Sequence, residues 1–270
     1  MKRNLMNGSL VVGLAMGAAT TAAADFPTFP LRRCAPDAVV AGTVCLDRYE
    51  ASVWRVPNPT TANVSLVKKI QLGKATEADL AAGGATQLGT ASDDYAPCTD
   101  NGQNCANDIY AVSLPSVIPA ANITWFQAQE ACANAGKRLP TSAEWQVGAN
   151  GTPDPGPDDR ATTCNTANNA TTVLTGSRSA CVSARKAADM VGNVAEWVAD
   201  WVPLSTECPG WAGFSDDIMC LSGASTSGSG PGALVRGGFF FGGEVHGPLT
   251  IIGTIDPTRS EDFLGFRCGR

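Results

Sequence analysis

Residues 123–149 read ITWFQAQEACANAGKRLPTSAEWQVGA and carry the clearest local signals for the fold. Thr124 followed by Gln127 forms a capping box, in which each side chain bonds the backbone amide of the other residue. This pair predicts a helix over residues 125–135, which Gly136 ends. The apolar residues of this helix fall on one face, so we expect that face to be buried.

A second helix follows directly in the same stretch. Thr141 and Glu144 form another capping box, which predicts a short helix that ends near Ala149. Pro140 keeps the residue before it out of the helical region, so an extended link separates the two helices. The stretch therefore predicts two short helices, each with a defined first residue.

The rest of the sequence favours short strands and long loops. Residues 43–56 are rich in β-forming residues and predict one strand, and the tail, residues 234–270, alternates short apolar runs with glycines. Residues 57–122 mix Pro, Gly, Ala and Asp and are interpreted as a decorated insertion, with a short helix near residues 76–82. Together these patterns predict an α+β, loop-rich domain.

Composition excludes several classes of protein. The chain has 270 residues, of which 44% are hydrophobic, and this is ample for a sizeable core. Intrinsic disorder is excluded because the apolar fraction is ordinary and no long block of charge is present. With 19 basic and 25 acidic residues, the net charge of −6 argues against nucleic acid or an anionic membrane as the main partner.

The first 24 residues have the pattern of a signal peptide. Lys2 and Arg3 precede a small apolar run over residues 10–19, and Ala22–Ala24 supply small residues before Asp25. The apolar run is short for a membrane span, so cleavage before Asp25 is expected. We therefore predict a secreted or periplasmic protein with no membrane span in the mature chain.

Export changes the meaning of the ten cysteines. Their number is even, none forms a CxxC pair, and a single histidine is available to complete a zinc site. Disulfides are therefore the expected state, although spacing alone leaves many pairings open. The pairs that look local are Cys34 with Cys45, Cys98 with Cys105, Cys164 with Cys181, and Cys208 with Cys220. They leave Cys132 and Cys268 over.

Four segments taken together resemble the sulfatase-modifying factor family, which includes the formylglycine-generating enzyme. They are DRYEASV (47–53), residues 123–149, DMVGNVAEWVADW (189–201) and LVRGGFF to GFRCGR (234–270). The resemblance covers residues 44–270, after an extended lead over residues 25–43. It implies a C-type-lectin-like, formylglycine-generating-enzyme-type fold stapled by disulfides. It also implies that Cys132 pairs with Cys268.

The segment DMVGNVAEW is the first candidate for a metal site. Asp189 and Glu196 are carboxylates separated by a glycine-containing turn, which could fold around one hard cation. The resemblance implies calcium bound by these side chains and by the carbonyls of Gly192 and Val194. The alternative is a turn whose acids only cap backbone amides. A second family calcium site corresponds to CNTANNA, where ordinary turns are favoured over ligation by Asn165, Asn168 and Asn169.

The catalytic residues of the formylglycine-generating enzyme are missing. The resemblance implies two copper-binding cysteines in the C-terminal segment, at positions that fall near Gly242 and Gly247 here. No cysteine lies between Cys220 and Cys268, and copper(I) needs soft ligands that glycine lacks. The three-histidine iron site of a second family branch is excluded because the chain has one histidine. No copper or iron site is therefore recognised.

His246 and Glu244 form the only acid–base pair in the corresponding segment, and we treat them as catalytic candidates, although a lone histidine is more often a surface residue.

Core packing is favoured over a pocket for Trp125, Trp145, Trp197 and Trp201. Ion pairing with Glu50, Glu144 or Glu196 is favoured for Arg138, Arg236 and Arg267.

The leading functional hypothesis is an exported, calcium-stabilised binding or structural module. Its ligand would be an exported protein, a peptide or a glycan, and loops on the scaffold would carry the specificity. The alternative is an enzyme, either an oxidoreductase or a modifying enzyme of a secreted peptide, similar to the pyoverdine-maturation branch of the family. Fold class alone does not decide between them.

Overall fold

The computed structural model describes residues 33–167, 171–224 and 230–270. The chain divides into two units, Met1–Leu31 and Arg32–Arg270, and the description below concerns the second. The expected signal peptide, residues 1–24, lies outside the described residues. Within the described part, no helix has the length and apolar character needed to cross a membrane.

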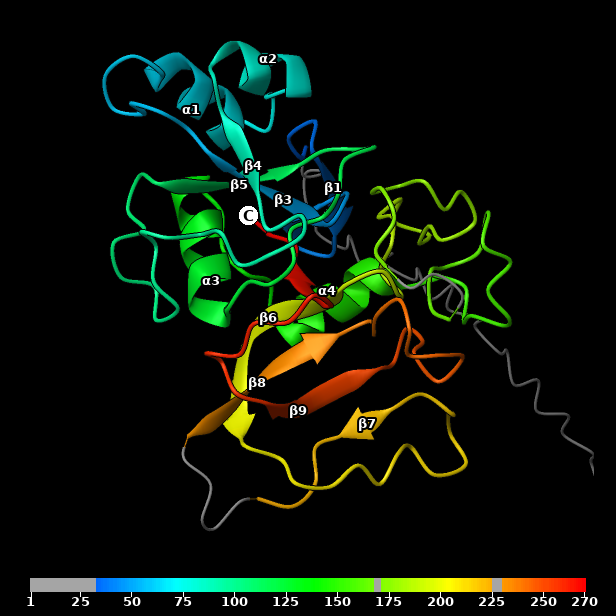
Figure 1. Cartoon of the computed structure of the whole chain (residues 1–270). Helices are drawn as coiled ribbons and strands as arrows, with labels where there is room; N and C mark the ends of the chain where they lie inside the picture. The colour runs from blue at the N-terminus through cyan, green and yellow to red at the C-terminus, as the bar shows by residue number, and fades with distance from the viewer. Residues whose placement is uncertain (1–32, 168–170, 225–229) are drawn as a thin grey trace, which may run out of the picture. The chain divides into compact units, whose positions relative to one another are not determined.

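The strands of the described residues form three small sheets (Figure 1). The first is the antiparallel pair β1 (Ala38–Ala41) and β2 (Val44–Asp47). The second has the order β4-β3-β5, with β3 (Ala51–Arg55), β4 (Thr86–Leu88) and β5 (Ile109–Ser113). The third has the order β10-β6-β8-β9-β7, with β6 (Ala195–Pro203), β7 (Met219–Cys220), β8 (Pro231–Arg236), β9 (Ile251–Ile255) and β10 (Leu264–Phe266).

Four helices of the described residues pack around these sheets. They are α1 (Val64–Gln71), α2 (Glu77–Ala82), α3 (Trp125–Asn134) and α4 (Ser142–Ala149). Both predicted capping boxes are present, because the side chains of Thr124 and Thr141 accept from the backbone amides three residues later and the reciprocal bonds are made. Figure 1 shows α1 and α2 next to β4, at the opposite end from the five-stranded sheet. The α+β, loop-rich architecture predicted from the sequence is confirmed.

The single strand predicted over residues 43–56 is wrong, because the chain breaks at residues 48–50 into β2 and β3. The break places Glu50 in the protein interior, where it is completely buried. The segment interpreted as a decorated insertion also contributes to the core. Its strand β5 pairs with β3 and is buried along its whole length.

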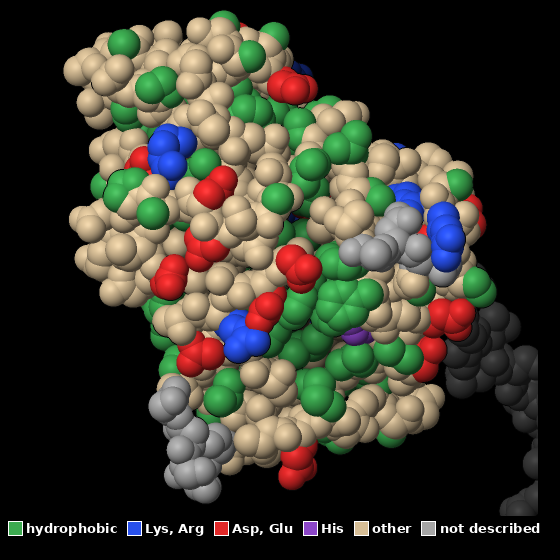
Figure 2. All heavy atoms as spheres, viewed as in Figure 1, with side chains coloured by type: hydrophobic (Ala, Val, Ile, Leu, Met, Phe, Trp, Pro, Cys, Tyr) green, Lys and Arg blue, Asp and Glu red, His purple; other side chains and the backbone are tan. Residues whose placement is uncertain are grey.

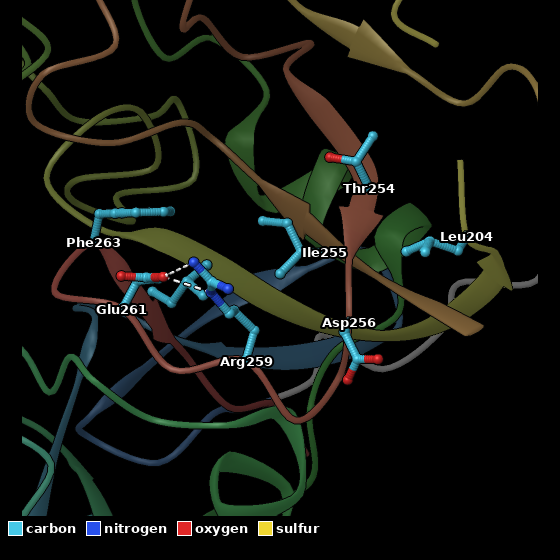
Figure 3. Close-up of a pocket in the computed structure, with 8 residues that line it drawn as sticks. Leu204, Thr254, Ile255, Asp256, Arg259, Glu261 and Phe263 are labelled. Atoms are coloured by element: carbon cyan, nitrogen blue, oxygen red, sulfur yellow. Dashed lines mark hydrogen bonds and ion pairs between the residues drawn. The ribbon is translucent and has the colours of Figure 1, made fainter. Parts of the chain in front are cut away.

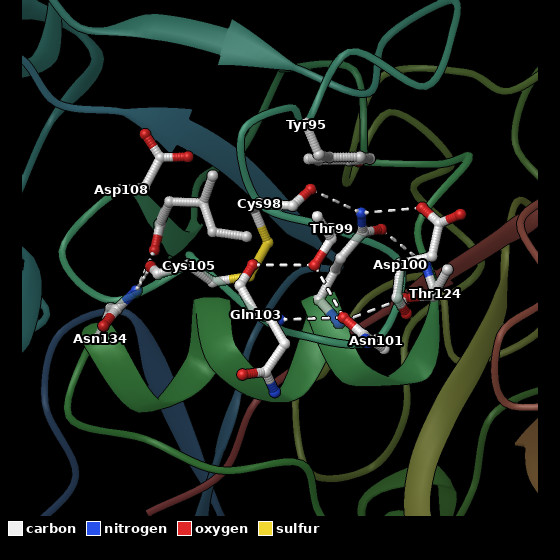
Figure 4. The surroundings of a disulfide bond; sticks show 12 residues. Tyr95, Cys98, Thr99, Asp100, Asn101, Gln103, Cys105, Asp108, Thr124 and Asn134 are labelled. Atoms are coloured by element: carbon white, nitrogen blue, oxygen red, sulfur yellow. Dashed lines mark hydrogen bonds between the residues drawn. A yellow bond between two sulfur atoms is a disulfide. The ribbon is translucent and has the colours of Figure 1, made fainter.

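All ten cysteines are paired, and the pairs are the same five that spacing and the family resemblance favoured. Four bridges are local, and the surroundings of one of them, Cys98–Cys105, are shown in Figure 4. There the Thr99 hydroxyl and amide both bond the Gln103 carbonyl oxygen, so the bridge closes a hydrogen-bonded loop beside α3. The fifth bridge, Cys132–Cys268, joins α3 to the residues after β10 across 136 positions.

Removing the Cys132–Cys268 bridge is expected to destabilise the protein most. A bridge that closes a longer loop restricts the unfolded chain more, so the Cys132→Ala/Cys268→Ala variant should lose about 3–5 kcal/mol. The matched Cys98→Ala/Cys105→Ala variant opens a loop of only 7 positions and should lose about 2 kcal/mol. Urea unfolding of the two variants measures the difference, and equal losses would contradict this account of the long-range bridge.

Candidate functional site

A buried ionic centre lies where β2, β6 and β10 meet. The guanidinium of Arg267 is completely buried and bonds both carboxylate oxygens of Glu196, at 2.5 and 2.6 Å. Trp145 donates from its indole nitrogen to the same carboxylate, at 2.7 Å. The remaining guanidinium hydrogens bond four backbone carbonyls, those of Asp47, Arg48, Ala188 and Asp189.

Glu50 holds the turn between Asp189 and Glu196 in place. Its carboxylate accepts from the side-chain amide of Asn193 at 2.6 Å and from the backbone amide of Val194 at 3.1 Å. Asn193 has a φ of 60°, a left-handed conformation that the short amide side chain tolerates. The turn is therefore fixed by a buried carboxylate that comes from a segment more than 100 residues earlier in the chain.

The charge balance of this centre bears on the predicted calcium ligands. Three buried carboxyl groups, Glu50, Asp189 and Glu196, surround the buried Arg267, and a second buried arginine, Arg178, also acts on Asp189. Burial raises the pKa of Glu50 well above its usual value, and it raises the pKa of Asp189 to about 6. A bound cation would offset the remaining negative charge. The donor set of carboxylate and carbonyl oxygens is also of the kind that calcium prefers.

The predicted calcium ligands already have protein partners. Glu196 gives both oxygens to Arg267, and Asp189 accepts from the amide of Gly176 at 2.5 Å. A calcium ion would therefore share Glu196 with the guanidinium. In the second predicted site Asn165 bonds Asn193, while Asn168 and Asn169 lie outside the described residues. Over the described ranges, no group of three or more His, Cys, Asp or Glu side chains is placed to hold a metal.

At Gly242 and Gly247, the positions that the resemblance matches to catalytic cysteines, an added side chain would require neighbouring side chains to move. A Cβ atom at Gly242 would collide with the imidazole of His246. A Cβ atom at Gly247 would collide with carboxylate oxygens of Asp217 and Asp154. Since every cysteine of the chain is in a disulfide, no thiol is available elsewhere. In this segment a histidine lies beside Gly242, and two aspartates lie beside Gly247.

His246 is buried, with 2% of its surface exposed, so the expectation of a surface histidine is wrong. Its Nδ1 accepts from the backbone amide of Phe239 at 3.1 Å. Burial lowers the pKa of His246 to about 4, so the ring is neutral at pH 7 with its hydrogen on Nε2. Glu244 is exposed, and the structure does not bring it together with His246 as an acid–base pair.

Three phenylalanines pack against one another, and one of them, Phe239, packs against the histidine. We term these four residues the aromatic hollow: Phe239, Phe241, Phe263 and His246. Phe239 lies 4.4 Å from Phe241, 4.4 Å from His246 and 4.5 Å from Phe263 between ring centroids. Phe241 is 53% exposed. Figure 2 shows the purple of the chain's one histidine at the base of a depression between hydrophobic side chains. The sequence signal for this site is the run Phe239–Phe241, whose importance we missed.

A cavity of about 310 Å³ adjoins the aromatic hollow and shares Phe263 with it (Figure 3). Leu204 and Ile255 supply further apolar lining. Arg259 and Glu261 form an exposed ion pair at the rim of the cavity. The combined site therefore offers one exposed and two partly buried phenylalanine rings beside one cationic and one anionic group.

The predicted tryptophans divide into two groups. Trp145 and Trp197 are completely buried, as favoured from the sequence, whereas Trp201 is 43% exposed. Trp201 packs edge-to-face on Trp125 and Phe126, with centroids 5.0 and 5.6 Å away. The core interpretation is therefore wrong for Trp201, which is held rigidly at the surface.

The predicted arginine ion pairs form in two of three cases. Arg138 pairs with Glu144 at 2.7 Å, and Arg267 pairs with Glu196. Arg236 instead bonds the side-chain oxygen of Gln146 and lies 4.8 Å above the ring of Trp145. Arg236 is the last residue of β8, and the chain turns directly after it at Gly237 and Gly238.

A family model described as sulfatase-modifying factor enzyme 1-like domain matches residues 98–270. Solved structures that match include the Major Tropism Determinant P3c variant, at 19% identity over 86% of this chain and 51% of that chain, with a TM-score of 0.43. PvdO from Pseudomonas aeruginosa matches at 18% identity over 84% and 80%, with a TM-score of 0.43. CarF matches at 18% identity over 56% and 67%, with a TM-score of 0.35. The chain spans about half the length of the Major Tropism Determinant variants, and no curated protein matches it.

The buried histidine predicts a specific pH dependence of stability. Its pKa of about 4 in the folded protein lies below its ordinary value of 6.5, so between these values the unfolded chain binds a proton that the folded protein does not. Stability should therefore fall as the pH decreases from 6.5 to 4, by about 3 kcal/mol from this group. The His246→Asn variant keeps an acceptor for the Phe239 amide and should lose this part of the pH dependence. Urea unfolding across this pH range tests it, and equal slopes for both proteins would contradict the assignment.

Proposed function

The chain belongs to the family of sulfatase-modifying factor enzyme 1-like domains, and we propose that it is an exported binding module of that family without copper–cysteine chemistry. The formylglycine-generating-enzyme-type, α+β, loop-rich fold implied by the four sequence segments is confirmed. Export is supported by the signal-like pattern of the first 24 residues and by five disulfides, which form and persist in oxidising compartments.

One observation carries the proposal: the thiol positions are filled by other groups. Formylglycine formation requires a thiolate, and the soft copper(I) ion is held by sulfur ligands. Here His246 takes the space beside Gly242, and Asp217 and Asp154 take the space beside Gly247. Restoring cysteine at either position would require these side chains to move. The segment therefore offers no thiol for the oxidation.

The aromatic hollow is the ligand-contacting surface in this proposal. Aromatic side chains contribute large contact areas at low entropic cost and are enriched where proteins bind partners. Phe241 is exposed but is fixed by rings on two sides, Phe239 and Phe263, so little ordering is needed on binding. Arg259 and Glu261, at the rim of the adjoining cavity, supply polar contacts that orient a ligand. The ligand is an exported peptide, protein or glycan.

The binding proposal is tested by substituting Phe241. We expect Phe241→Ala to weaken binding to ligands identified on peptide and glycan arrays by about tenfold or more, because its exposed ring is lost from the contact. Phe214→Ala is the matched control, since Phe214 is 76% exposed and packs only against Trp211 among the aromatic rings of the described residues. Surface plasmon resonance with the array ligands measures both. Equal affinity of Phe241→Ala and the unmodified protein, or no ligand on either array, would contradict the proposal.

We further propose that calcium stabilises the fold through Asp189, Gly192, Val194 and Glu196. The support is the excess of buried carboxylates around Arg267. Glu196→Gln is a poor test because it would leave the buried guanidinium of Arg267 without its partner. Asp189→Asn keeps an oxygen for the Gly176 amide while it removes one negative charge.

Chelation is therefore expected to lower the melting temperature of the unmodified protein, and Asp189→Asn should reduce this sensitivity by about half or more. The reason is that the ion loses a charged ligand but keeps a neutral oxygen. Differential scanning calorimetry with and without EDTA measures the effect. An identical melting temperature before and after confirmed metal removal would count against the site.

A further inference from the structure

Two aspartates from different loops converge beside Gly247. A Cβ atom built on this glycine would collide with Oδ1 of Asp217 and with Oδ1 of Asp154. Asp154 belongs to the loop after α4, and Asp217 belongs to the loop closed by the Cys208–Cys220 bridge. The two oxygens therefore face the same point from two separate segments, with only the glycine backbone beside them.

The carboxylate of Asp217 lacks one partner. The residue is buried, with 2% of its surface exposed, and its Oδ2 accepts from the backbone amide of Leu249 at 2.8 Å. Its Oδ1, the atom aimed toward Asp154, is also buried and makes no hydrogen bond of good geometry, although the nearby backbone amide of Gly247 lowers the pKa of this carboxyl group. A buried carboxylate oxygen without a partner is strongly unfavourable unless something absent from the protein chain satisfies it.

Carboxylates outnumber cations around this point. Asp216 adds a third carboxylate, and it raises the pKa of both Asp154 and Asp217 after the larger effect of burial. The buried Arg236 is attracted electrostatically to Asp217, but it directs its hydrogen bonds to the oxygen of Gln146 and to the carbonyl of Pro248. The chain therefore supplies convergent oxygen acceptors, and one arginine faces the charge of three carboxyl groups.

We propose that Asp154 and Asp217 bind one hard divalent cation, which ties the loop after α4 to the Cys208–Cys220 loop beside Gly247. Hard cations such as calcium and magnesium take carboxylate oxygens together with water and backbone carbonyls, at about 2.0–2.6 Å. Because Asp154 is exposed, water can reach a cation between the two side chains and complete its coordination shell. This site is distinct from the one at Asp189 and Glu196 and goes beyond the proposed function.

A cation at this position would also hold the segment that includes His246 in place. Gly247 directly follows His246, and Leu249 is bonded by the same Asp217 carboxylate. A cation here fixes the residues that place the histidine at the base of the aromatic hollow. It would lie beside Gly247, one of the two positions that the resemblance matches to catalytic cysteines, and its ligands would be oxygen atoms and not sulfur.

Isothermal titration calorimetry with calcium chloride or magnesium chloride, after removal of bound metal, tests the site. We expect Asp154→Asn and Asp217→Asn each to weaken one binding event by about tenfold or more, because each removes a charged ligand. Asp154→Asn alters an exposed side chain, so it keeps the test valid if Asp217→Asn fails to fold. Glu77→Gln, an exposed acid on α2, is the matched control and should bind as the unmodified protein does.

The variants also separate the two cation sites. Asp189→Asn should leave cation binding at Asp154 and Asp217 unchanged. Failure of the calcium proposal at Asp189 would therefore not count against the site at Asp154 and Asp217. The relative affinity for the two metals identifies which cation the site selects. Unchanged binding of both metals in Asp154→Asn, or no event in the unmodified protein at millimolar metal, would overturn the proposal.

Discussion

The bond between Arg267 and Glu196 is the interaction on which the rest of the structure depends. The guanidinium lies at the C-terminal end of the chain, yet it contacts the end of β2, the residues before the Asp189 turn, and β6. Removing one partner of a buried ion pair costs about 3–5 kcal/mol, because the other charge is left in the interior. The Cys132–Cys268 bridge secures the same region from the opposite side, since Cys268 follows Arg267 directly. Segments far apart in sequence are therefore joined around one cation.

This arrangement distinguishes the scaffold from the surface that we propose contacts a ligand. The ionic centre and the long-range bridge hold β6 and β10 together, while residues 237–263 link β8 to β10, include β9, and carry the aromatic side chains of the hollow. The backbone of this segment is bonded to the scaffold, since Phe240 donates to the carbonyl of Asn193 and Phe263 accepts from the amide of Ala195, whereas its exposed aromatic side chain is not part of the ionic centre. Fold and activity can therefore diverge within the family, and activity has to be argued from the surface segment.

Local signals predicted local structure well. Both capping boxes form because each depends on four consecutive residues. The break between β2 and β3 was missed because it exists to bury Glu50 against Asn193, a contact between residues 143 positions apart. The burial of His246 was missed for the same reason, since the segment GGEVHGP has the composition of an exposed loop. Propensity describes neighbours in sequence, whereas these positions are decided by tertiary contacts.

The central claim is that this family scaffold carries no thiol for formylglycine chemistry. The most direct measurement is incubation of the protein, copper and oxygen with a sulfatase-type cysteine peptide, followed by mass spectrometry of the peptide. With all ten cysteines in disulfides, the account predicts a peptide mass unchanged relative to the protein-free control. Conversion of the peptide cysteine to the aldehyde faster than in that control would contradict it, and would require one of the five bridges to open during the reaction.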